Sequence, residues 1–159
     1  MNVKMGEIQV SKSPGTKLVA PGLGSCIALI MYDSVCKAAG LAHIVLPDST
    51  CYNKPNLLLG KYADIAVPNL LDQMYRLGAR KNNIVTKIAG GAQMFSFEKG
   101  SNVLNIGLRN TIAVKSALNK EGLSIQASNT GGTKGRTVQI DVLTGNAYVK
   151  IIGQQEIEF

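Results

Sequence analysis

Two short apolar runs joined by a polar turn constrain the fold most strongly. They occupy residues 26–32 and 38–46, and Asp33-Ser34 opens the segment between them. Each run is too short for a typical helix, and turn-forming residues close the first one. The pattern therefore predicts a hairpin of two buried strands.

The register of this hairpin decides whether Cys26 meets His43, the only histidine of the chain. A four-residue loop at residues 33–36 places the two directly opposite each other, with Cβ atoms about 4.5–5.5 Å apart on one face. A five-residue loop opposes Cys26 to Ile44 and sends the two side chains to opposite faces. A bulge near Gly40 would restore the first arrangement. Both registers are compatible with the sequence.

The rest of the chain predicts two helices and further short strands. Helical spacing spans residues 62–77, where Pro68 either kinks the helix or marks its start, and a second helix capped by Asn105 runs to about Lys120, with Ile106 facing inward. Further strands are expected at residues 7–11, 17–20, 83–89, 123–127, 138–142 and 148–152. We expect an α+β fold, a layered α/β sandwich with mixed, mostly antiparallel sheets and two main helices, in a single domain of residues 1–159.

Composition limits the kinds of partner and compartment. The chain has 159 residues and a formal net charge of +7, but its basic residues are dispersed and lack interleaved aromatics, so nucleic-acid binding is not expected. No leader pattern opens the sequence, and no apolar run approaches the roughly 20 residues of a membrane span. We expect a cytoplasmic protein without membrane insertion.

Three cysteines, an odd number without CxxC spacing, favour reduced thiols over a disulfide frame or a metal site. Cys36 and Cys51 are interpreted as ordinary small hydrophobes, and Cys51 falls in a loop expected over residues 49–60, beside the site. No metal and no organic cofactor is expected.

Cys26 has two interpretations. Free cysteine is commonly a buried hydrophobe. However, Gly22 and Gly24 allow the backbone to approach a ligand closely, and successive N–H groups at Gly24, Ser25 and Cys26 can form an oxyanion-binding nest. A neighbouring His43 would activate the thiol, although a histidine in an apolar strand can also be a satisfied core residue. Together the pair favours thiol nucleophilic catalysis.

Two glycine patterns do not support nucleotide binding. Ile27 stands where a dinucleotide fingerprint has its third glycine, and a strand follows instead of a helix. The pairs Gly90-Gly91 and Gly131-Gly132 lack the lysine spacing of a phosphate-binding loop. Both pairs are expected to form tight turns that line the site.

Along nearly its whole length, the sequence resembles the chemoreceptor glutamine deamidase family, CheD. The resemblance rests on six motifs in the family's order: GLGSC (22–26), GLAHIVLPDS (40–49), KYAD (61–64), KIAGGAQMF (87–95), NIGLRN (105–110) and TGGTKGR (130–136).

The resemblance implies a hydrolase that converts glutamine side chains of methyl-accepting chemotaxis receptors to glutamate. It implies Cys26 as the nucleophile and His43 as its base, on a fold like that of cysteine-dependent toxin deamidases. Gly24, Ser25, Gly131, Gly132 and Arg136 are the expected oxyanion or substrate-binding residues. A CheC-type phosphatase is the implied protein partner.

Two positions depart from the family pattern. Ala20 stands where a threonine usually orients the histidine, and Asn129 replaces an acidic residue before the TGG turn. An unoriented imidazole lowers the rate. The alternative is therefore a non-catalytic chemotaxis adaptor that binds the receptor or the CheC-type phosphatase.

Overall fold

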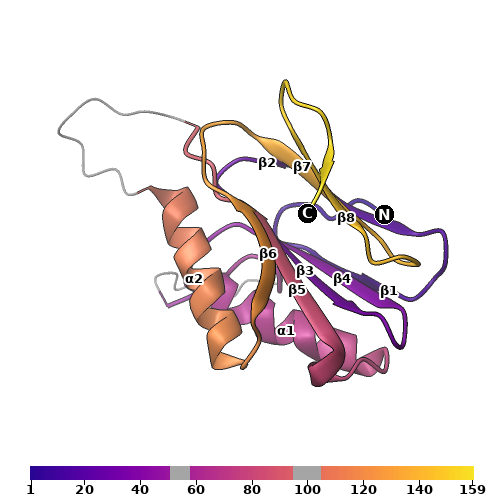
Figure 1. Cartoon of the computed structure of the whole chain (residues 1–159). Coiled ribbons are helices and arrows are strands. Elements are labelled where there is room, and N and C mark those ends of the chain that lie inside the picture. The colour runs from indigo at the N-terminus through magenta and orange to yellow at the C-terminus, as the bar shows by residue number, and fades with distance from the viewer. Residues whose placement is uncertain (51–57, 95–104) are drawn as a thin grey trace, which may run out of the picture.

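The computed structural model describes residues 1–50, 58–94 and 105–159, and its elements form three layers. Helices α1 and α2 cover one face of a mixed sheet, and a second, antiparallel sheet packs on the opposite face (Figure 1). The expected α+β layered fold with two main helices is confirmed.

The first sheet has the strand order β1-β4-β3-β5-β6. Neighbouring strands are antiparallel except β5 and β6, which are parallel and connected through α2. The strands are β1 (Ile8–Ser11), β4 (Ala38–Ile44), β3 (Ile27–Asp33), β5 (Ile84–Gly90) and β6 (Ile125–Thr130). A short 3₁₀ helix at Lys81–Asn83 leads into β5.

The second sheet has the order β2-β7-β8-β9 and is antiparallel throughout. Its strands are β2 (Lys17–Leu23), β7 (Arg136–Asp141), β8 (Ala147–Ile151) and β9 (Ile157–Glu158). The strand expected at residues 17–20 continues to Leu23, through a register irregularity between Ala20 and Leu23. The short strand β9 was not predicted from the sequence.

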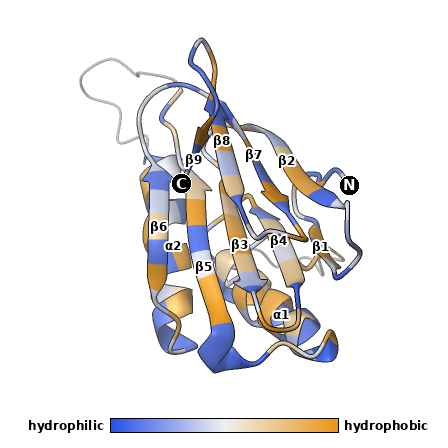
Figure 2. Ribbon diagram, turned by 45° about the vertical axis from the view of Figure 1, so that its right-hand side comes forward, coloured by the Kyte–Doolittle hydropathy of each residue, from blue (hydrophilic) through white to orange (hydrophobic). Residues whose placement is uncertain are grey.

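The two apolar runs form the centre of the molecule, as expected. Every residue of β3 and β4 is buried. Alternate residues of β3 point to different layers: Ile27 and Leu29 pack with the helices, whereas Ala28 and Ile30 pack with the second sheet. Figure 2 shows both helices on one side of β3 and β4, with β2, β7 and β8 on the other. Two-sided burial explains why these strands are continuously apolar.

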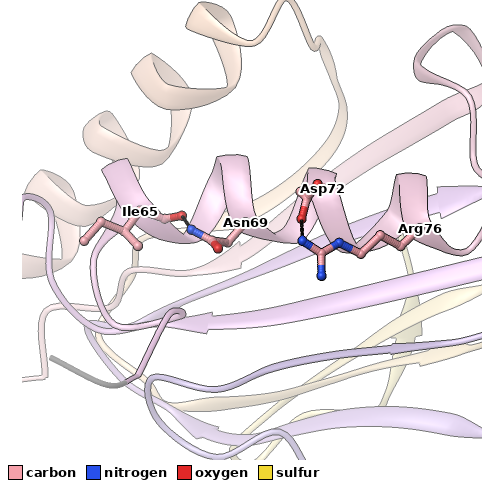
Figure 3. A network of polar contacts seen from close by, with 4 residues as sticks. All are labelled: Ile65, Asn69, Asp72 and Arg76. Carbon is pink, nitrogen blue, oxygen red and sulfur yellow. Dashed lines mark hydrogen bonds and ion pairs between the residues drawn. The ribbon is translucent and has the colours of Figure 1, made fainter.

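Helix α1 (Ala63–Arg76) includes Pro68 in its interior, so the proline does not mark its start. Polar contacts on its outer surface follow the spacing of one helical turn (Figure 3). The Asn69 side chain donates to the Ile65 carbonyl at 2.8 Å, and Arg76 pairs with Asp72. Within the described ranges, no helix is long and apolar enough to cross a membrane.

Helix α2 (Ile106–Lys120) begins as its sequence predicts. The Asn105 side chain accepts a hydrogen bond from the Leu108 N–H at 2.9 Å and so caps the first turn. Ile106 is exposed, contrary to expectation. The buried face is instead formed by Gly107, Asn110, Thr111 and Val114 with Ala117 and Leu118.

Candidate active site

Cys26 lies in the three-residue loop between β2 and β3, and the residue is only 8% exposed. It belongs to the hydrophobic cluster between the two sheets, together with Ala28 and Ile30. Burial raises the pKa of the Cys26 thiol, and the cysteine's own N–H acts in the opposite direction. The thiol is therefore held mainly in its neutral form at rest.

Neither of the two registers considered from the sequence is found, because His43 pairs with Ala28 and Ile44 pairs with Ile27. The cause is the turn: Asp33 remains in β3 opposite Ala38, while its carboxylate accepts hydrogen bonds from the Val35 and Cys36 N–H groups. The loop has the expected four residues, but it spans residues 34–37 instead of 33–36. Each residue of β3 therefore pairs with a residue of β4 two positions later in the chain than a loop at 33–36 would give.

A shift of two residues preserves the face of a strand. Cys26 precedes Ala28 by two residues, and both side chains belong to the cluster between the sheets. His43, opposite Ala28, points into the same layer and is a diagonal neighbour of Cys26. The Cα atoms of such neighbours typically lie about 7–8 Å apart. Cys26 and His43 therefore share one face, as a four-residue loop implies, and do not lie on the opposite faces that a five-residue loop implies.

The His43 ring is oriented by a backbone carbonyl. Its Nδ1 lies 3.2 Å from the Val3 carbonyl oxygen, which can only accept, so Nδ1 carries the proton and Nε2 the lone pair. Within the described part of the chain, the buried Nε2 has no hydrogen-bond partner. Burial lowers the His43 pKa, while the Val3 bond and the charge of Glu7 partly oppose this effect. The ring is therefore neutral and basic at Nε2.

The segment before β1 places Val3 beside the ring. The Val3 N–H donates to the Val19 carbonyl at 2.7 Å, and the His43 backbone exchanges hydrogen bonds with Gly6 and Glu7. Ala20 is fully buried in the same cluster as Cys26 and offers no hydroxyl. A main-chain carbonyl thus contacts the His43 ring, which the resemblance led us to expect a threonine to orient. No side-chain pattern in the sequence could have indicated it.

All three carbonyls of the Cys26 loop accept hydrogen bonds. Gly24 accepts from the Ala92 N–H at 2.8 Å, and Cys26 accepts from the Gly91 N–H at 2.8 Å. The Ser25 carbonyl accepts from the Asn110 side chain at 2.9 Å. Because the peptide bonds of this loop are trans, the N–H groups of Ser25 and Cys26 point away from these donors. No other described residue accepts from these two N–H groups.

Gly90 lies against the Cys26 carbonyl and needs to be glycine. Its φ is +122°, and a Cβ added there would lie 2.1 Å from the Cys26 oxygen. The expected tight turn is not found, because Gly90 is the last residue of β5 and Gly91 follows it without a turn, but the pair supports the cysteine loop.

Asn110 is a site residue that was not singled out from the sequence. It is fully buried, and its amide nitrogen donates to the carbonyls of both Ser25 and Val45 at 2.9 Å. One signal was available: Asn110 ends the NIGLRN motif at an inward-facing position of the predicted helix. A buried asparagine on an apolar helix face requires partners.

Comparisons with known proteins identify the family of the chain. A family model described as CheD chemotactic sensory transduction matches residues 45–151. The chain is 44% identical over 153 residues to the "Probable chemoreceptor glutamine deamidase CheD" of Clostridium botulinum strain Hall, covering 96% of this chain and 93% of that protein. The protein of the same name from strain Alaska E43 is 46% identical over 154 residues, with the same shares of both chains covered. The chain belongs to the CheD family.

Among solved structures, the Bacillus licheniformis hypothetical protein YfiH has a TM-score of 0.46 at 13% sequence identity, covering 78% of this chain and 50% of that one. This similarity is too low to bear on the active site of a CheD family member.

In this CheD family member, the TGG turn (residues 130–132) contacts the segment of residues 90–93. The Gly131 N–H donates to Gly90, and the Gly132 carbonyl accepts from Gln93, each at 2.9 Å. A groove beside these contacts is lined by Gly91, Gln93, Met94, Asn105, Leu108, Thr111, Lys115 and residues 130–133. Met94 also packs against Gly24. The groove therefore adjoins the Cys26 loop, although among the described residues neither Cys26 nor His43 lines it.

Arg136 is 4% exposed and holds the TGG turn from within. Its guanidinium donates to the Asn129 carbonyl and side chain, at 2.5 and 2.6 Å, and to the Gly131 carbonyl. Burial lowers the Arg136 pKa. Asn129 stands where the family pattern has an acidic residue, and its neutral side chain accepts a hydrogen bond from Arg136.

Cys36 is half-buried and packs against the helical cluster, apart from the Cys26 loop. Cys51 and most of the loop expected over residues 49–60 lie outside the described residues.

Proposed function

We propose that this protein hydrolyses glutamine side-chain amides of methyl-accepting chemotaxis receptors to glutamate, with Cys26 as nucleophile and His43 as general base. The observation that carries the proposal is the His43 ring: it shares a face with Cys26, and the Val3 carbonyl leaves Nε2 as the basic nitrogen. Membership of a family whose curated relatives are named chemoreceptor glutamine deamidases supplies the substrate class.

In the first step, sulfur attacks the carbonyl carbon of the glutamine side chain. Burial favours a neutral thiol beside a neutral imidazole, so the proton passes from Cys26 to His43 Nε2 as the carbon–sulfur bond forms. The carbonyl oxygen becomes an oxyanion, which the N–H groups of Ser25 and Cys26 stabilise. Gly24 leaves room for the Met94 side chain, whose sulfur would lie 2.5 Å from a Cβ added at this position.

In the second step, the tetrahedral intermediate collapses to a thioester. His43 gives its proton to the departing nitrogen, so ammonia leaves and the carbon–nitrogen bond breaks. Water then attacks the thioester while His43 accepts one of its protons, which returns to sulfur as the glutamate product leaves. Atoms and charges balance without a metal or an organic cofactor.

Substrate contacts are proposed at Gly131 and Gly132, which line the groove beside the Cys26 loop. Arg136 supports these contacts by holding the turn, since its guanidinium is occupied by main-chain carbonyls. The receptor substrate and a CheC-type phosphatase are the proposed partners of a single cytoplasmic deamidase domain.

Mass spectrometry of receptor cytoplasmic fragments tests the proposal. Each converted glutamine gains about 1 Da, the difference between an amide and an acid. We expect Cys26→Ala to abolish this gain and Cys36→Ala, the matched control in the other described free cysteine, to retain it. Deamidation that persists in Cys26→Ala would overturn the proposal.

A second candidate, a non-catalytic adaptor for the receptor or the CheC-type phosphatase, is favoured by Ala20 and by the low exposure of Cys26. It predicts partner binding by a protein whose Cys26 iodoacetamide does not label at neutral pH. Labelling of Cys26 together with receptor deamidation excludes it.

A further inference from the structure

We propose that Asn110 is a positioning residue that aims the Cys26 N–H at the developing oxyanion. The inference rests on the proposed Cys26 chemistry and adds a residue from α2 to it. Asn110 contacts neither sulfur nor substrate, and acts through the Ser25 carbonyl to which it donates.

The orientation of the Asn110 side chain follows from its partners. Both are carbonyl oxygens, of Ser25 and Val45, and carbonyls accept only. The amide nitrogen, with two hydrogens, is therefore the atom that faces them. Within the described part of the chain, the buried Oδ1 has no partner. Retaining an asparagine with an unsatisfied oxygen costs free energy, which the two donated bonds offset.

The Ser25–Cys26 peptide is the unit that the Asn110 bond orients. In a trans peptide, holding the carbonyl on one side directs the N–H to the other. The Cys26 N–H belongs to the same residue as the proposed nucleophilic sulfur, and it lowers the thiol pKa against the effect of burial. An oxyanion formed at that sulfur would lie within reach of this donor.

The neighbouring peptides are held by a different kind of donor. Gly24 and Cys26 accept from the main-chain N–H groups of Ala92 and Gly91, and neither donor is part of a side chain. Ser25 alone in the loop accepts from a side chain, among the bonds of the described residues. Asn110 is thus the position where one substitution can release the central peptide without removing the others.

The second bond of Asn110 couples the loop to the histidine strand. Val45 follows β4 two residues after His43, so one amide group joins the backbones that carry the two proposed catalytic residues. Gly107, one turn earlier on α2, packs closely against the Gly91 carbonyl. The beginning of α2 therefore supports the Cys26 loop through a backbone contact at Gly107, and Asn110 orients the Ser25–Cys26 peptide within that loop.

Two reagents separate positioning from general structure. Acylation of Cys26 by p-nitrophenyl acetate passes through an oxyanion, whereas alkylation by iodoacetamide does not. For Asn110→Ala we expect acylation to slow by about tenfold or more, and alkylation to stay within about twofold of wild type. Neither reaction needs the receptor, so failure of this inference is separable from failure of receptor deamidation.

Asn69→Ala is the matched control, because Asn69 also donates its amide to a main-chain carbonyl but lies on α1 (Figure 3). We expect both of its rates to equal those of wild type. If Asn110→Ala does not fold, Asn110→Leu keeps the volume without donors. Equal slowing of both reactions, unchanged acylation, or a wild-type protein that is alkylated but never acylated would each overturn the proposal.

Discussion

The two residues of the proposed catalytic pair are held by different regions of the molecule. The loop around Cys26 is fixed at all three carbonyls by residues that follow β5 and by α2. The ring of His43 is fixed at one nitrogen, by the carbonyl of Val3. The cysteine is therefore supported by the centre of the fold, whereas the orientation of the histidine depends on the segment that precedes β1.

The difference implies separable defects. Changes at Gly90 should disturb the Cys26 loop and destabilise the fold together, because Gly90 contacts the Cys26 carbonyl where β3 and β5 pair. Changes near Val3 should disturb the histidine while leaving the thiol accessible to small reagents. The following predictions test this separation, in order of decreasing effect.

The largest effect is expected at Gly90. Gly90→Ala introduces a Cβ that would lie 2.1 Å from the Cys26 carbonyl, so we expect a loss of about 3 kcal/mol or more in the free energy of unfolding. Gly15→Ala is the control: its φ is also positive, at +80°, but no atom lies within 4 Å of the added Cβ. The control should lose only about 1 kcal/mol. Equal losses in urea unfolding would contradict the close contact.

A smaller effect is expected from deleting residues 1–4, which removes the Val3 carbonyl. Free rotation of the imidazole should lower kcat for receptor deamidation by roughly 10- to 100-fold, with little change in KM. Iodoacetamide should still alkylate Cys26. An unchanged kcat would show that the Val3 bond does not orient His43.

The pH dependence of stability should report the burial of His43. Because burial lowers its pKa below 6.5, the unfolded chain binds the proton more readily, and stability falls as pH drops below about 6.5. The slope should approach about 1.4 kcal/mol per pH unit until the folded protein also titrates. His43→Gln should remove this slope between pH ~4.5 and ~6.5. An unaltered slope would contradict the neutral ring.

The smallest effect is expected outside both regions. Arg76 and Asp72 pair at 2.8 Å on α1, where their side chains are 77% and 55% exposed (Figure 3). Arg76→Ala should change the free energy of unfolding by less than about 0.5 kcal/mol and leave deamidation at the wild-type rate. A larger loss in the free energy of unfolding would show that this surface of α1 contributes more to stability than its contacts indicate.

The sequence predicted the features that depend on local pattern. The apolar runs gave the central strands and Asn105 marked the start of α2, whereas the common face of Cys26 and His43 was one of two arrangements that the sequence left open. The residue pairs between β3 and β4 were not predicted correctly, because Asp33 is the last residue of β3 and its carboxylate also accepts a hydrogen bond within the turn.

The two contacts that orient the site could not be predicted in this way. The Val3 carbonyl is a main-chain group, and every residue has one, so sequence composition carries no record of its use. Asn110 was visible as a polar residue on an inward helix face, but its partners come from Ser25 and Val45, far away in the chain. Tertiary packing alone brings these groups together.

The central claim, covalent catalysis by Cys26, is tested most directly by the intact mass of the protein quenched in acid during its first turnover of a glutamine-containing receptor peptide. The account predicts a species equal to protein plus peptide less one ammonia, with the added mass on Cys26 and absent from Cys26→Ala. Formation of glutamate without any mass added to Cys26 would contradict it.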